Sequence, residues 1–140
     1  MDLEEVYKQF LSLPKEKLFE LGVQTGQKLI EILDSHFGDH KKSFAQFVKI
    51  YGSFSGIDWK ITPEEHELFI KLTGVSSSFT EFEQAVKDSY DIDSMIAIDN
   101  LIDENPYDIK PLVMRLGFVI CAYDGIFTND EKALLEKFLA

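Results

Sequence analysis

Hydrophobic residues recur at three- and four-residue intervals along almost the whole chain, the spacing that places side chains on one face of an α-helix. No segment alternates between apolar and polar residues with the flanking turn residues typical of a β-strand. We therefore expect an all-α fold of seven or eight helices in a single domain, residues 1–140. The helices are predicted over about 3–14, 15–37, 39–54 and 63–74, from Ser78, from Asp91 or Asp93 to Asn105, from about Asp108 to Tyr123 and from Thr128.

Helix start signals are clearest at two places. In Thr62-Pro63-Glu64-Glu65 the threonine can cap the helix, proline suits its first position, and Glu65 can reach back to the Thr62 amide. Thr128-Asn129-Asp130-Glu131 repeats the threonine and the glutamate at the same spacing. Ser78 and Glu81 form a third pair of this kind, so each site predicts a capping box.

The most apolar segment of the chain is Pro111–Tyr123, which Arg115 interrupts. It is much shorter than the roughly 20 apolar residues that a membrane-spanning helix needs. We expect it to form the central buried helix, and we expect no direct insertion into a membrane.

An internal repeat relates the middle of the chain to its end. When the sequence is shifted by 66 residues, residues 48–72 lie over 114–138, and Asp58, Thr62 and Glu65 fall on Asp124, Thr128 and Glu131. Apolar positions before and after these residues also coincide. The repeat predicts two helix–loop–helix halves, 40–74 and 106–140, which follow the N-terminal helices of 1–38.

The segment Ala122-Tyr-Asp-Gly-Ile-Phe-Thr-Asn-Asp-Glu-Lys-Ala-Leu-Leu135 resembles the signature of the TerB-like family, named for bacterial tellurite-resistance proteins. A related module occurs beside a membrane-anchored J-domain co-chaperone. The resemblance covers about residues 40–140 and is most specific at 118–135. The first copy departs from the family pattern, because Asp58 is followed by Trp59 and Gly56 lies before it. The resemblance implies about seven helices, an acidic surface and a role in metal or stress responses, without an established enzymatic reaction.

Charge and cysteine content narrow the class of protein. The 25 acidic residues outnumber the 14 lysines and arginines, for a formal net charge of −11, which argues against a nucleic-acid-binding surface. A single cysteine cannot form an internal disulfide, and the acidic start Met1–Glu5 lacks the basic region of a secretory signal. We therefore expect a cytoplasmic protein.

Two hypotheses account for the acidic residues of the repeat. Asp58, Glu65, Asp124 and Glu131 carry hard oxygen donors, which Ca²⁺, Mg²⁺ or Mn²⁺ prefer, and the two halves would bring them together if they packed face to face. Alternatively, the aspartates only hold tight loops and the glutamates only complete capping boxes. The second hypothesis needs no ligand.

Two aromatic residues, at the end of the predicted helix 39–54 and in the loop that follows it, suggest a partner-binding surface. Trp59 and Phe54 lie close together in the sequence, and exposed aromatic residues often anchor protein interfaces. Alternatively, Trp59 covers the hydrophobic core and binds no partner.

Other chemically active residues are sparse. His36 and His40 have the spacing of a zinc pair on a helix, but Gly38 lies between them and is expected to end that helix. Cys121 lies on the most apolar helix without a partner motif, which is typical of an inert buried thiol.

Three functions therefore stay open. The leading hypothesis is a non-enzymatic module that binds a protein partner, and the alternative is a divalent-cation-binding protein that uses the duplicated loops. An enzyme ranks last, because the sequence shows no pair of nucleophile and base and no cofactor motif. The partner and the oligomeric state are not predicted.

Overall fold

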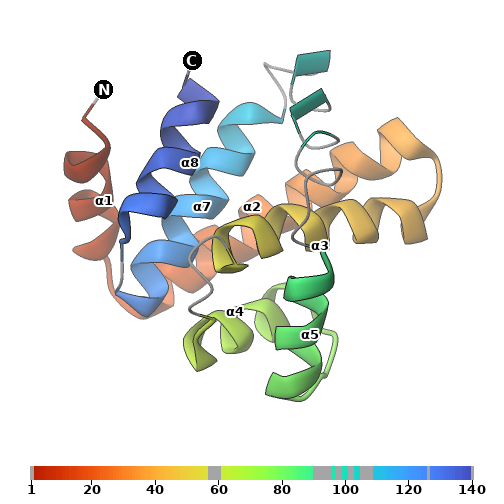
Figure 1. Ribbon diagram of the computed structural model, residues 1–140, viewed down its shortest axis with the longest axis horizontal. Helices are drawn as coiled ribbons and strands as arrows, with labels where there is room; N and C mark the ends of the chain where they lie inside the picture. Colours follow the sequence, from red (N-terminus) through yellow and green to blue (C-terminus); the bar gives the residue numbers. More distant parts are fainter. Residues whose placement is uncertain are drawn as a thin grey trace.

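A computed structural model describes residues 2–56, 61–89, 96, 99–100, 103–104, 109–125 and 127–139 (Figure 1). Its helices are α1 (Leu3–Leu11), α2 (Lys15–Phe37), α3 (His40–Gly56), α4 (Pro63–Thr73), α5 (Phe79–Ser89), α7 (Lys110–Asp124) and α8 (Asn129–Leu139). The described residues contain no strand, so the all-α prediction is confirmed. The predicted helix between Asp91 and Asn105 falls largely outside these residues.

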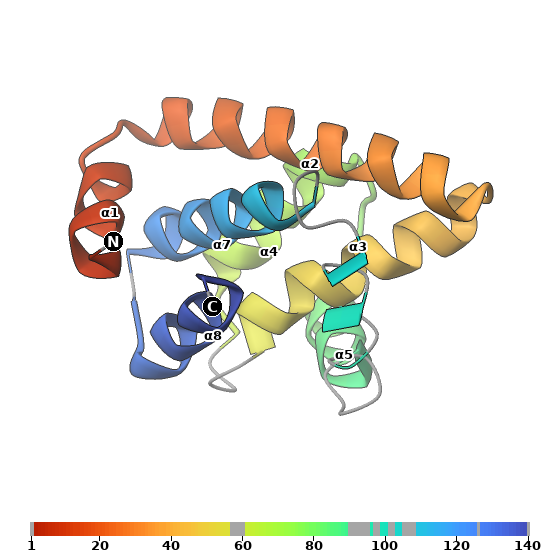
Figure 2. The same cartoon turned by 90° about the horizontal axis from the view of Figure 1, so that it is seen from above.

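The long helix α2 organises the fold. It lies along one face of the molecule, where it packs against α7, α3 and α4 (Figure 2). Helices α1 and α8 pack together at one end, and α5 packs against α3 and α4 (Figure 1). In the part of the chain that the structure describes, no helix is both long and apolar enough to cross a membrane.

Two glycines let α2 approach its neighbours closely. A Cβ atom at Gly22 would lie 3.2 Å from the Val119 side chain on α7 and 3.3 Å from Leu72 on α4. At Gly26 it would lie 3.6 Å from the Phe47 ring on α3. Contacts near 3.2 Å are tighter than ordinary van der Waals packing, so a side chain at Gly22 would require the Val119 and Leu72 side chains to shift by a few tenths of an ångström.

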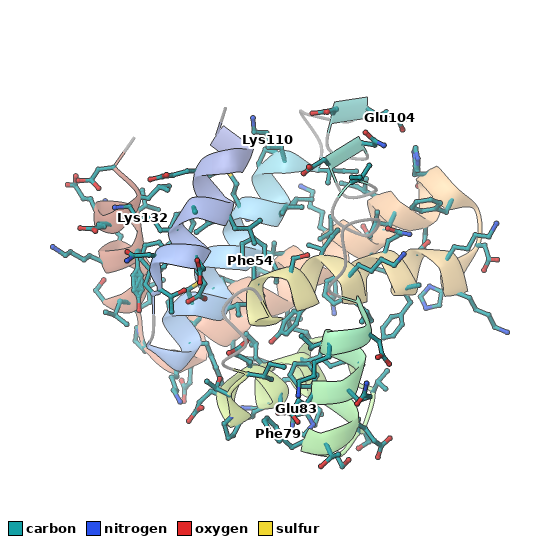
Figure 3. The ribbon with its side chains drawn as sticks, viewed as in Figure 1. Phe54, Phe79, Glu83, Glu104, Lys110 and Lys132 are labelled. Atoms are coloured by element: carbon teal, nitrogen blue, oxygen red, sulfur yellow. The ribbon has the colours of Figure 1, made fainter. Side chains whose placement is uncertain are left out.

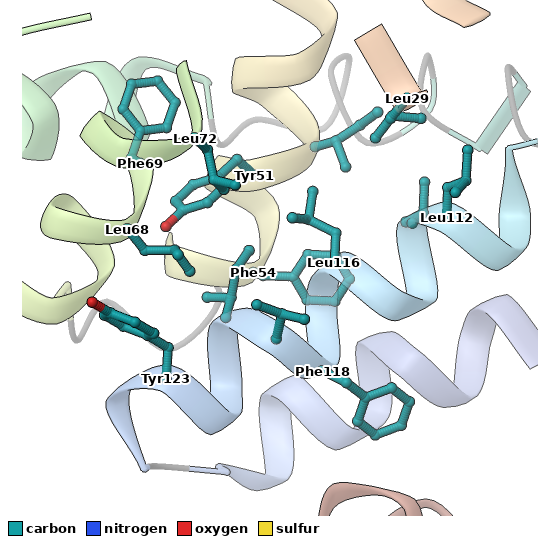
Figure 4. Packing of buried hydrophobic residues seen from close by; sticks show 14 of the residues in the cluster. Leu29, Tyr51, Phe54, Leu68, Phe69, Leu72, Leu112, Leu116, Phe118 and Tyr123 are labelled. Carbon is teal, nitrogen blue, oxygen red and sulfur yellow. The ribbon is translucent and has the colours of Figure 1, made fainter. Parts of the chain in front are cut away.

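Helix α7 forms the centre of the core, as its apolar sequence predicts. Val113, Leu116 and Val119 are completely buried. The Phe54 ring of α3 packs against α7 at Gly117, where an added Cβ atom would overlap the ring (Figure 4). The shift of 66 residues places Tyr51 opposite Gly117, so at this position the two halves differ and the fold requires a glycine.

Helix ends follow the predicted signals with small shifts. Gly38 ends α2 and Gly125 follows α7, each with the positive φ (67° and 74°) that glycine adopts without strain. Helix α1 ends at Leu11 rather than near residue 14: the Leu13 amide donates to the Phe10 carbonyl, only three residues back, and the Ser12 hydroxyl donates to the Gln9 carbonyl, which closes the last turn. Helix α7 begins at Lys110, which leaves Pro111 in the first turn as expected.

A polar contact holds α4 on the end of α7. Tyr123 donates to the Glu67 carboxylate at 3.0 Å, and the Lys71 ammonium lies 2.8 Å from the same oxygen. The hydrogen bonds from Lys71 and Tyr123 hold the pKa of Glu67 below its ordinary value. The charged form of Glu67 is therefore favoured by folding.

Substituting Gly117→Ala tests the contact between α3 and α7. The added methyl group overlaps the Phe54 ring, and overpacking of a core costs about 1–3 kcal/mol of the free energy of unfolding. The measurement is chemical denaturation of G117A, F54L and the double variant. The cost of G117A is expected to shrink in the F54L background, because leucine leaves room for the methyl group. A G117A protein as stable as the wild type would contradict this packing.

Glu67→Gln tests the contact between α4 and α7 through its pH dependence. Because folding lowers the pKa of Glu67, its stabilisation is present at neutral pH and is lost as the pH falls below about 4.3 through the lowered value. Both Glu67 and Lys71 are about half exposed, so we expect a loss of roughly 0.2–1 kcal/mol at pH 7.

The measurement compares unfolding midpoints of the wild type and E67Q between pH 7 and pH 3, where the two should converge. Glu83→Gln on α5 is the control, because Glu83 pairs with Lys87 at the longer distance of 3.7 Å (Figure 3). A difference between wild type and E67Q that grows on acidification would contradict the assignment.

Candidate functional site

The two threonine–glutamate pairs of the repeat form closely matched helix starts. Thr62 Oγ1 accepts from the Glu65 amide at 3.2 Å, and the Thr62 amide donates back to the Glu65 carboxylate at 3.3 Å. At α8 the corresponding distances between Thr128 and Glu131 are 3.1 and 3.0 Å. The predicted capping boxes are therefore present at both sites, and each glutamate is only 4% exposed.

The preceding helix secures each cap in a different way. The Tyr51 hydroxyl of α3 donates to the Glu65 backbone carbonyl at 2.6 Å. On α7, the Cys121 thiol donates to the Glu131 carboxylate at 2.8 Å. These contacts tie the first turn of each second helix to the core, so the buried glutamates serve the fold directly.

The proposed cation ligands are only partly placed by the structure. Glu65 and Glu131 lie in their capping boxes, each with one carboxylate oxygen accepting hydrogen bonds from its threonine. Asp58 lies outside the described residues, and Asp124 is the last residue of α7. Among the described residues, no three histidine, cysteine, aspartate or glutamate side chains form a group that could hold a metal ion. The cation hypothesis stays a prediction that needs Asp58 and Asp124.

The prediction that Phe54 belongs to a partner-binding surface is wrong, because its side chain is not exposed. The Phe54 side chain is 1% exposed and lies at the centre of the molecule, between α3 and α7 (Figures 3 and 4). Its ring fills the space that Gly117 leaves, so a partner cannot reach it. Trp59, the other half of that surface, lies outside the described residues.

The histidines and the cysteine take structural positions. Gly38 separates His36 from His40 as predicted, and His36 lies 3.9 Å from Glu104 while His40 lies 3.2 Å from Asp34. Cys121 is completely buried, as its apolar helix predicts.

An apolar groove on the surface is the strongest candidate for a functional site. We call it the α2–α4 groove: it is lined by Gln27 and Ile30 of α2, His40, Lys41 and Phe44 of α3, Leu72 and Thr73 at the end of α4, and Val75. Its volume is about 530 Å³, within the range of roughly 300–1,000 Å³ common for ligand sites. Most of its lining surface is apolar.

The geometry of the α2–α4 groove follows from the close packing of α2. Leu72 contacts α2 at Gly22 and Gly26 on its inner side and also lines the groove. Ile30 and Phe44 are half-buried, so their outer surfaces face the opening. Val75 follows Gly74, the glycine that ends α4, and is 45% exposed. The groove therefore has a rigid floor and one exposed apolar edge.

The ionisable groups in and beside the groove come from α2, α3 and the turn between them. His40 and Lys41 belong to the lining, and among the residues that the structure describes no carboxylate does. Asp34 lies against His40, and the Ser43 hydroxyl and the His40 imidazole hold its pKa below the ordinary value. The Asp39 carboxylate accepts from the Lys41 amide at 2.9 Å and so caps the start of α3.

Sequence reasoning missed the groove, although one signal was present. The buried face of α2 contains Leu29 and Leu33, and Ile30 lies one position away from that face. An isoleucine at the edge of the buried face is only partly covered by the core, so part of its apolar side chain stays at the surface. The sequence alone does not say that α4 ends opposite it.

A second groove is smaller, at about 270 Å³, and lies between α1 and Phe127. Glu4, Tyr7, Lys8 and Leu11 complete its lining. Lys132 of α8 pairs with Glu4 at 3.1 Å beside it (Figure 3). The lining of the second groove contains both an acidic side chain, Glu4, and a basic one, Lys8, so it has no preference for a ligand of one charge. It also offers less apolar surface than the α2–α4 groove.

No protein-family model matches the chain, and neither a curated protein nor a solved structure matches it. The resemblance to the TerB-like family over residues 40–140 therefore stays a prediction from the sequence.

Glu131→Ala separates capping from cation binding. If Glu131 only caps α8 and accepts from Cys121, the substitution lowers the free energy of unfolding by about 1–3 kcal/mol, equally in chelator and with added Ca²⁺, Mg²⁺ or Mn²⁺. Thermal and chemical unfolding under each condition provide the measurement. Asp130→Ala is the matched control, because Asp130 is the exposed neighbouring acid and its loss should cost little. A cost of E131A that appears only with one cation would support a metal site instead.

Proposed function

We propose that this chain is a non-catalytic interaction module that binds a segment of a partner protein in the α2–α4 groove. The observation that carries the proposal is an open apolar groove framed by three helices, with half-buried Ile30 and Phe44 in its walls. Grooves of this kind take apolar side chains from a partner segment. The proposal keeps the class of function expected from the sequence and moves its location from Phe54 and Trp59 to the α2–α4 groove.

The chemistry of the groove supports binding more than catalysis. Its ionisable groups are Lys41 and His40, and the latter lies against Asp34. The Thr73 hydroxyl donates to the Phe69 carbonyl at 2.8 Å and accepts from the Val75 amide at 3.2 Å, so it is used within the fold. Reaction sites typically combine a nucleophile with an oriented base, and this lining offers apolar contact instead.

The biological setting that we propose is a bacterial stress response. It rests on the similarity of residues 122–135 to the TerB-like signature, together with the acidic charge of the chain. A module of this type would act by bringing a partner to other components rather than by converting a substrate.

Val75→Glu tests whether the groove binds peptides. Random peptides displayed on phage are selected on the full-length protein, and the enriched peptides are measured against variants. Because Val75 is 45% exposed, V75E should keep the fold while placing a charge at the apolar edge, and we expect binding to weaken by about tenfold or more.

The control is Leu11→Glu, which introduces the same charge at a residue that is 47% exposed on α1. Peptide binding should be unchanged in L11E. Circular dichroism and thermal unfolding check that both variants are folded. Enriched peptides that bind V75E as tightly as the wild type would contradict the proposed function.

A further inference from the structure

We infer that the segment bound in the α2–α4 groove carries a carboxylate beside its apolar residues. This inference rests on the proposed function and identifies the chemistry of the partner. Three features carry it: the charge of the groove's surroundings with the ammonium of Lys41, which is unpaired among the described residues; the engagement of Asp34 and Asp39 by other groups; and the exposed amide of Gln27.

The charge around the groove differs from that of the rest of the chain. Between residues 27 and 49 there are four lysines and three acidic residues, whereas the whole chain has 14 basic and 25 acidic residues. Two of the three histidines, His36 and His40, lie in the same segment. With four lysines against three acids, residues 27–49 carry a slight net positive charge and so repel an anionic ligand less than the chain as a whole does.

Two of the three acids of this segment, Asp34 and Asp39, are engaged by other groups, and the third is the exposed Glu31 of α2. Asp34 lies 3.2 Å from His40, and Asp39 accepts from the backbone at the start of α3. In the part of the chain that the structure describes, no carboxylate lies within ion-pair distance of the Lys41 ammonium. Lys41 is exposed and lines the groove, so its charge is available to a carboxylate of the ligand.

The apolar wall and the polar edge together fit a peptide segment. Ile30, Phe44 and Val75 offer aliphatic and aromatic contact for its apolar side chains. Gln27 is exposed at the groove, and its side-chain amide can donate to and accept from a peptide group. A single-chain carboxylate amphiphile could use the apolar wall and Lys41, but a peptide segment can in addition form hydrogen bonds with the Gln27 amide.

Lys41→Glu tests the inference with the peptides selected on the full-length wild-type protein. We expect these peptides to be enriched in aspartate or glutamate next to large apolar residues. We expect K41E to weaken their binding by about tenfold, since it replaces an attraction with a repulsion. Replacing the peptide's acidic residues with asparagine or glutamine should weaken its binding to the wild type and have little effect on its binding to K41E.

The control is Lys8→Glu, which changes the net charge of the protein by the same amount on α1, at the second groove. Peptide binding should be nearly unchanged in K8E. If K8E and K41E weaken binding equally, net charge rather than Lys41 is responsible and the inference is overturned. Glutamate is favourable in the first turn of a helix, so K41E is expected to fold.

The remaining outcomes separate the inference from the proposed function. Peptides that lose binding in V75E but carry no excess of acidic residues and bind K41E normally would overturn the inference and leave the proposed function standing. Enriched peptides that do not depend on Val75 would overturn both. Decanoate, a single-chain carboxylate, is the last probe: if it binds at the groove and no displayed peptide does, the groove takes a small amphiphile and both are wrong.

Discussion

The close approach of α2 to α4 and α7 is the constraint on which the rest of the structure depends. Gly22 lets α2 lie against Leu72 and Val119 so closely that an added Cβ atom would make unusually tight contacts, at 3.3 and 3.2 Å. Leu72 packs in the core beneath α2 and also forms part of the surface groove. The groove is therefore a consequence of how the core packs, and its floor is as rigid as the core itself.

The two segments that the sequence repeat relates, 40–74 and 106–140, supply the helices around this contact. Four matched apolar pairs are buried in both segments: Ile50 and Leu116, Phe54 and Ile120, Leu68 and Leu134, and Phe69 and Leu135. The second helices, α4 and α8, each begin with a threonine–glutamate cap whose glutamate is buried. The halves differ where they meet, since Phe54 of one packs on Gly117 of the other (Figure 4). The two caps are held by different contacts, from Tyr51 in one and from Cys121 in the other, and they indicate that Glu65 and Glu131 contribute to folding before any ligand is considered.

Much of the fold could be predicted from the sequence, because helix periodicity, capping boxes and terminal glycines are local signals. The helix limits of α2, the caps at Thr62 and Thr128 and the burial of α7 all follow from them. The site could not be predicted in the same way. The prediction that Phe54 is exposed is wrong because the ring packs against Gly117, which lies 63 positions later in the chain. The groove is formed by side chains from three helices, and the relative placement of these helices is not a local property of the sequence.

We propose that the α2–α4 groove binds a peptide segment with apolar and acidic side chains, and the most direct test is the backbone amide NMR spectrum of the isotope-labelled protein during titration with one such peptide. If the peptide binds there, the largest shifts occur at residues 27–30, 40–44 and 72–75, which line or flank the groove. Shifts concentrated on α1 and α8, or spread evenly over the acidic surface, would contradict this proposal.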